Sequence, residues 1–73
     1  MNVFLIKHSE REYDYYLGHV IIANNKDEVI KLAKKNSRDE GEKIWDEAMI
    51  TMIGEYTGNR KRAFVLLSDF NAG

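Results

Sequence analysis

The sequence contains neither cysteine nor proline. Without cysteine the chain forms no disulfide and offers no thiolate ligand for zinc, which fits a reducing compartment. Without proline, its turns depend on glycine, asparagine and aspartate. Its apolar runs are much shorter than the ~20 residues that cross a bilayer, so we expect no contact with a membrane.

An excess of charge is also missing, because 11 Lys and Arg residues face 12 Asp and Glu residues, for a net charge of −1. This balance creates no long-range attraction to nucleic acid or to an anionic membrane. The N-terminal stretch MNVFLIKHSE lacks the basic region and the small-residue cleavage site of a signal peptide. We therefore expect a cytoplasmic protein.

What the sequence does contain is typical of a folded domain. The 73 residues are 44% hydrophobic and 32% charged, a composition that argues against disorder. We expect one domain, residues 1–73. A chain of this length buries roughly 60% of its unfolded surface. Its free energy of unfolding should be on the order of 4–11 kcal/mol.

Four apolar segments predict strands, because they are rich in β-branched and aromatic residues. Within the second, Gly18 predicts either a bulge or the close approach of another backbone. The stretch SDFNAG that follows the last segment is expected to be a tail. The four predicted strands are Val3 to Ile6, Tyr15 to Ala23, Ile50 to Tyr56 and Ala63 to Leu67.

One segment between the second and third strands predicts a helix. Asn25 suits the N-cap, and Glu28 three residues later completes a pattern like a capping box. The polar stretch that ends at Gly41 should stop the helix. Residues 42–49, EKIWDEAM, fit either a second helix or a loop that leads into a strand. The apolar face of the predicted helix consists of Val29, Ile30, Leu32 and Ala33.

The order β-β-α-β-β predicts an α+β fold: a small antiparallel sheet of about four strands with one helix packed on a face. The strand segments VFLI, VII and AFVLL are apolar on both faces, and one helix covers only one of them. The other face must be covered by residues 42–49, by a second copy of the chain or by a different protein. The excess of apolar sheet therefore predicts a binding protein, as a homodimer or with another protein.

The stretch EREYDYYLGH is the first candidate for contact with a partner. In a strand, Tyr13 and Tyr15 point to one side, whereas Asp14 and Tyr16 point to the other. Either the rings cap the edge of the core with their hydroxyls in water, or they form an aromatic, acidic rim that receives a basic partner. The full set of candidate partner contacts is Tyr13, Asp14, Tyr15, Tyr16, Trp45 and Phe70.

The basic cluster Arg60, Lys61 and Arg62 lies on a predicted turn and supports a second hypothesis, a nucleic-acid accessory factor. The simpler interpretation is a charged turn that protects the sheet edge.

A third hypothesis, a minimal enzyme or metal site, would use His8 or His19 with nearby carboxylates. Neither histidine has a second ligand at zinc spacing, and the five glycines form no phosphate loop. We expect no enzymatic activity and no cofactor.

Several stretches together resemble a group of small phage and prophage proteins, which mostly carry no assigned function. That group ends in a sequence close to SFNAG, and here Asp69 is inserted between Ser68 and Phe70. The resemblance implies a bacterial host cell as the setting, and binding to a host or phage protein, in some cases to block a defence system. It rests on EYDYY, VIIA, NNKDEVIKLA, Trp45, ITMIGEY and LLSDFNAG.

Overall fold

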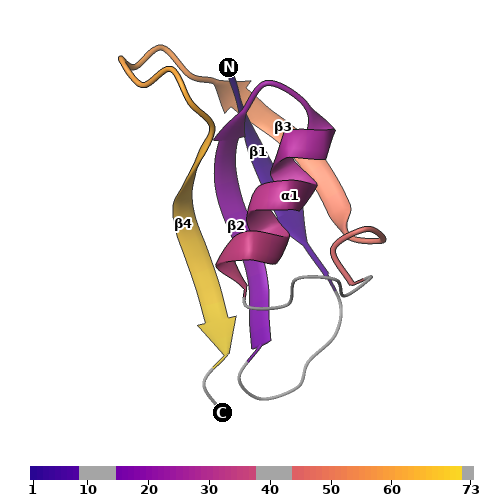
Figure 1. Ribbon diagram of the computed structural model, residues 1–73. Helices are drawn as coiled ribbons and strands as arrows, with labels where there is room; N and C mark the ends of the chain where they lie inside the picture. Colours follow the sequence, from indigo (N-terminus) through magenta and orange to yellow (C-terminus); the bar gives the residue numbers. More distant parts are fainter. Residues whose placement is uncertain (9–14, 38–43, 72–73) are drawn as a thin grey trace.

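The computed structural model describes residues 1–8, 15–37 and 44–71. They form four antiparallel strands in one sheet with a single helix packed on it, so the predicted α+β fold is confirmed (Figure 1). None of the helical residues described forms a segment long and apolar enough to cross a membrane. The elements are β1 (Asn2–Lys7), β2 (Tyr15–Ala23), α1 (Lys26–Asn36), β3 (Met49–Glu55) and β4 (Phe64–Asn71).

The sheet has the strand order β3-β1-β2-β4, so the two strands that come first in the sequence are central. β3 and β4 lie on opposite edges, and the connection between them must pass from one edge to the other. It does so at the end where β1 begins, where the Tyr56 backbone N–H donates to the Met1 carbonyl at 3.0 Å. The central position suits β1 and β2 because their apolar residues are sheltered by a strand on each side.

The register of β1 and β2 decides which residues share a face. Phe4 pairs with Ile21 and Ile6 with His19, and all four side chains are buried under α1. Alternate residues of both strands therefore point away from the helix. The core between sheet and helix consists of Phe4, Ile6, Ile21, Ala23, Val29, Ala33 and Trp45.

The helix begins where its sequence signals predict. The Asn25 side chain accepts a hydrogen bond from the Glu28 backbone N–H at 3.0 Å. The Glu28 carboxylate accepts from the Asn24 N–H at 2.7 Å, one residue before the donor of a standard capping box. The helix ends at Asn36, and Ser37 caps it. Gly41 lies outside the described residues.

Residues 44–47 form turns, Ala48 a bend, and β3 begins at Met49, so the described part of the segment 42–49 is a loop that leads into a strand and not a second helix. Trp45 is fully buried in the core on the α1 side of the sheet. An ion pair between Lys34 of α1 and Asp46, at 2.9 Å, joins the loop to the helix. This loop therefore covers the same face as α1, and it does not cover the other one.

The expectation of a tail after Leu67 is wrong for the described residues. β4 continues through Asn71, with Ser68 paired to His19 and Asp69 paired to Gly18. The stretch SDFN has few residues that favour strands. It is held in the sheet because β2 extends far enough to pair with it.

Gly18 fulfils both predictions made for it. The register of β2 against β4 shifts between Tyr16 and Gly18, which marks a bulge. A β-carbon at Gly18 would lie 2.8 Å from the Ile6 carbonyl oxygen, which is closer than real contacts allow. This position therefore requires glycine.

Candidate functional site

Three of the predicted partner contacts, Tyr15, Tyr16 and Phe70, lie where β2 begins and β4 ends. Tyr13 and Asp14 lie outside the described residues. Tyr15 and Phe70 supply backbone to β2 and β4, and Phe70 pairs with Tyr16. The acidic, aromatic rim at this end stays a prediction.

Tyr16 and Trp45 occupy the inner side of the sheet. The Tyr16 ring is half-buried and stacks on His19, with ring centroids 5.4 Å apart and an interplanar angle of 26°. This placement agrees with the interpretation that the ring caps the edge of the core. Trp45 is a core residue with no exposed surface, so it is removed from the set of partner contacts.

His19 is the centre of a buried polar group that the sequence analysis missed. Its Nδ1 lies 2.7 Å from the Ser68 hydroxyl and its Nε2 lies 2.6 Å from the Ser37 hydroxyl. A neutral imidazole donates from one nitrogen and accepts at the other, so both contacts form hydrogen bonds with a neutral ring. Because Ser37 ends α1 and Ser68 belongs to β4, the ring links the helix to the sheet edge. The sequence signal for this buried histidine was the alternation of His19, Ile21 and Ala23 on one face.

The surroundings of His19 keep the ring uncharged. Burial, and secondly the nearby His8, lower the pKa of His19 to about 4 from its usual 6.5. His8 lies edge-on to Trp45, with ring centroids 4.7 Å apart, and its Nε2 hydrogen bonds to the Tyr16 carbonyl. Within residues 1–8, 15–37 and 44–71, no three side chains of His, Asp or Glu gather as metal ligands. We interpret this group as structural.

The basic cluster lies on the connection between β3 and β4, where Arg60 has a structural role. Its guanidinium carbon lies 4.3 Å from the centre of the Phe64 ring, and its backbone N–H donates to the Tyr56 hydroxyl at 3.1 Å. The Tyr56 and Phe64 rings meet edge to face, 5.5 Å apart. Lys61 and Arg62 are exposed.

We expect Arg60→Ala to reduce the free energy of unfolding by about 0.5–1 kcal/mol, because it removes the cation–π contact with Phe64. The matched changes Lys61→Ala and Arg62→Ala should have almost no effect, since both side chains are exposed. Urea unfolding of the three variants measures the difference. Equal losses in all three would contradict the role given to Arg60. Binding of nucleic acid by this cluster stays a prediction.

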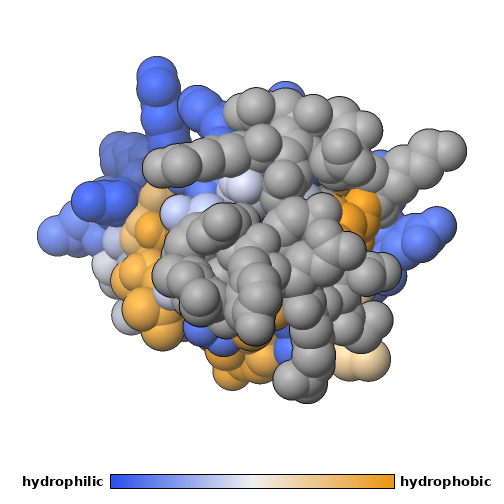
Figure 2. Space-filling view, turned by 90° about the horizontal axis from the view of Figure 1, so that it is seen from below, coloured by the Kyte–Doolittle hydropathy of each residue, from blue (hydrophilic) through white to orange (hydrophobic). Residues whose placement is uncertain are grey.

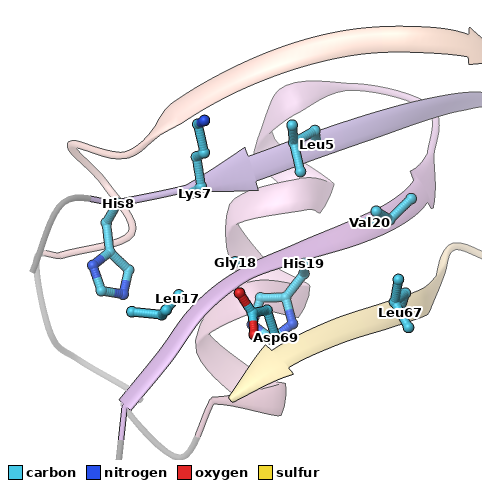
Figure 3. A pocket seen from close by; sticks show the side chains of 9 residues that line it. All are labelled: Leu5, Lys7, His8, Leu17, Gly18, His19, Val20, Leu67 and Asp69. Carbon is cyan, nitrogen blue, oxygen red and sulfur yellow. The ribbon is translucent and has the colours of Figure 1, made fainter. Parts of the chain in front are cut away.

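The face of the sheet opposite α1 contains a hollow of about 340 Å³ (Figure 3). Three of the residues around it, Leu5, Val20 and Leu67, are apolar and lie side by side on β1, β2 and β4. Leu67 is 66% exposed. We call this part of the surface the open face; it is formed by Leu5, Lys7, Gly18, Val20, Leu67 and Asp69.

The other end of the same side of the sheet is closed. Ile22 points away from α1, because it alternates with Ile21 and Ala23, yet it is 1% exposed. Its register partners are Val3 and Phe64, and Phe64 packs against the β3–β4 connection. The uncovered apolar sheet is therefore smaller than the sequence predicts, and it is concentrated at the open face and along the edges.

Both edge strands also expose large hydrophobic side chains. On β3, Met49, Met52 and Ile53 are 65%, 59% and 55% exposed, and Leu66 of β4 is 60% exposed. Figure 2 views the molecule from the end where β4 finishes, and hydrophobic residues reach the surface there among hydrophilic ones. β3 and β4 lie on opposite edges of the sheet, so these side chains form two separate apolar surfaces and not one continuous patch.

Comparison of the chain with protein-family models, with curated proteins and with solved structures finds no match. The assignment of a function therefore depends on the geometry of this chain.

Proposed function

We propose that this chain is a small non-enzymatic accessory protein of a phage or prophage, which acts by binding another protein through the open face. The observation that carries the proposal is the exposure of Leu67, beside the half-buried Leu5 and Val20, above a hollow with no covering element among the described residues. Removing such side chains from water favours association by about 25 cal/mol per Å² of apolar surface.

The bacterial setting of the proposal comes from the resemblance to small phage and prophage proteins. A binding role fits the architecture, because one helix on a four-stranded sheet buries a core and leaves one side of the sheet for recognition. Inhibition of a host or defence protein is the form of binding that the resemblance implies. The His19 group supports the fold, because its ring joins Ser37 at the end of α1 to Ser68 of β4.

Site-specific photocrosslinking in bacterial cells tests the proposal. A benzophenone amino acid at position 67 should give adducts of discrete mass, at least about fivefold more than the same group at Lys31. Lys31 is the matched control because it is exposed on α1, on the other side of the sheet.

The crosslinked protein must also bind the purified chain, and Leu67→Glu must abolish that binding, because a buried carboxylate at the centre of an interface is costly. Adducts that form equally from both positions, or from neither, would contradict the proposal. The identity of the adduct, a second copy or a different protein, is read from its mass.

A further inference from the structure

We propose that the open face binds a second copy of this chain, related by a two-fold axis that runs along β2 over Gly18. This inference rests on the proposed function and names its partner. Two features of the open face carry it: the placement of two charges, and the row of apolar residues beside them.

The two charges of the open face lie symmetrically about β2. Lys7 of β1 and Asp69 of β4 are both register partners of Gly18, one on each side. Adjacent strands are 4.7–4.9 Å apart, so the two backbones are separated by about 10 Å. Both side chains are exposed, and neither has an ion-pair partner in the part of the chain that the structure describes.

A two-fold axis parallel to β2 exchanges the two sides of this row. When two open faces meet across such an axis, β1 of one copy lies over β4 of the other. Lys7 then faces Asp69 of the second copy, and Asp69 faces its Lys7. Because both copies use the same surface, the two residues Lys7 and Asp69 form two symmetry-related ion pairs in the dimer.

A row of apolar residues, which lies two residues along the strands from the two charges, is arranged about β2 in the same way. Leu5, Val20 and Leu67 are register neighbours on β1, β2 and β4 (Figure 3). The axis places Leu67 over Leu5 of the second copy and Val20 over its own counterpart. The exposed Leu67 side chain thereby enters the hollow of about 340 Å³ on the facing sheet. Facing sheets pack about 10 Å apart, a distance that such side chains fill.

The charges favour a second copy over a foreign protein. A foreign partner requires no relation between Lys7 and Asp69, whereas self-pairing about β2 requires opposite charges at equal distances from that strand, as observed. A standard interface takes about 800 Å² from each partner. That is about 15% of the 5286 Å² surface of this chain.

Charge reversal tests this arrangement directly. Sedimentation equilibrium of the wild-type chain should show a dimer of about twice 8.5 kDa at tens of micromolar. Lys7→Glu should raise the dissociation constant of the dimer at least about tenfold, because the new carboxylate at position 7 faces Asp69 of the other copy twice. Asp69→Lys should do the same through two pairs of lysines. Lys31→Glu makes the same change of net charge on α1 and should leave the dimer intact.

Two recombinations of these changes distinguish pairing from a general effect of charge. The double variant K7E/D69K should dimerise as the wild type does, because each pair is restored with its signs exchanged. A mixture of the Lys7→Glu and Asp69→Lys chains should form a heterodimer, although neither chain pairs with itself. If a reversed variant fails to fold by circular dichroism, Lys7→Gln and Asp69→Asn replace it, with an expected weakening of about threefold.

The outcomes separate this inference from the proposed function. A monomeric wild-type chain whose position 67 crosslinks to another protein overturns the dimer and leaves the proposed function in place. A monomer without adducts from position 67 overturns both. A wild-type dimer that tolerates Lys7→Glu and Asp69→Lys equally well overturns the axis along β2.

Discussion

Replacing Trp45 with alanine is expected to reduce the free energy of unfolding by about 3–5 kcal/mol, as deletion of a buried aromatic side chain does in well-packed cores. Trp45 is the largest of the fully buried side chains among the described residues. It contacts His8 and His19 by ring packing, at centroid distances of 4.7 and 5.1 Å. A domain of this size is stable by only about 4–11 kcal/mol, so the variant should be unfolded at a much lower urea concentration.

Trp45→Phe is the matched control for this prediction. The indole Nε1 is buried and has no hydrogen-bond partner among the described residues, so phenylalanine loses volume and no hydrogen bond. We expect this change to cost about 1–2 kcal/mol. Urea unfolding at pH 7, followed by far-UV circular dichroism, measures both variants. A loss below about 1 kcal/mol for Trp45→Ala would show that the loop at residues 44–48 contributes little to the core.

Acidification should destabilise the protein through His19. The unfolded ring takes up a proton near its usual pKa of 6.5, whereas the folded ring, with a pKa of about 4, stays neutral. Between these values the unfolded state binds more protons, so the stability present above pH 6.5 is lost as the pH falls to about 4. We expect the free energy of unfolding to fall by about 2 kcal/mol. Ser68, which is hydrogen-bonded to the ring, is exposed, and its contact with water moderates the cost of a charge on His19.

His19→Gln isolates this contribution from the titration of carboxylates, because glutamine hydrogen bonds to serines and does not titrate. The variant should be less stable than the wild type at pH 7, and the difference should shrink steadily between pH 6.5 and 4. His8→Gln keeps the titrating ring of His19, so its stability should retain most of the pH dependence. A difference between His19→Gln and wild type that stays constant with pH would show that His19 has an ordinary pKa in the folded protein.

The elements predicted most accurately are those with local signals. The predicted second strand, Tyr15 to Ala23, matches β2 at both ends, and the predicted Asn25 N-cap is the cap of α1. These signals lie within a few residues of the structure that they specify. Ser68 to Asn71 were predicted to be a tail, because their place in the sheet depends on pairing with β2, some 50 residues earlier in the sequence.

The open face could be predicted only in part, for the same reason. The apolar character of VFLI, VII and AFVLL predicted an uncovered side of the sheet. The row of Lys7, Gly18 and Asp69 depends on which strands are neighbours and in what register, and those pairings are long-range. The burial of Ile22 was not predicted either. It depends on the connection from β3 to β4, which crosses between the two edges of the sheet and has no local signature in the sequence.

The placement of β3 and β4 on the two edges has a consequence for synthesis. When the ribosome has made only β1, β2 and α1, both central strands still present unpaired backbone, and β2 gains its outer neighbour only when residues 64–71 have been made. A chain released before β4 is made therefore exposes the unpaired edges of the β1–β2 hairpin, and such edges tend to pair with other nascent chains. Completion of the last strand is the event that leaves both inner strands with a neighbour on each side.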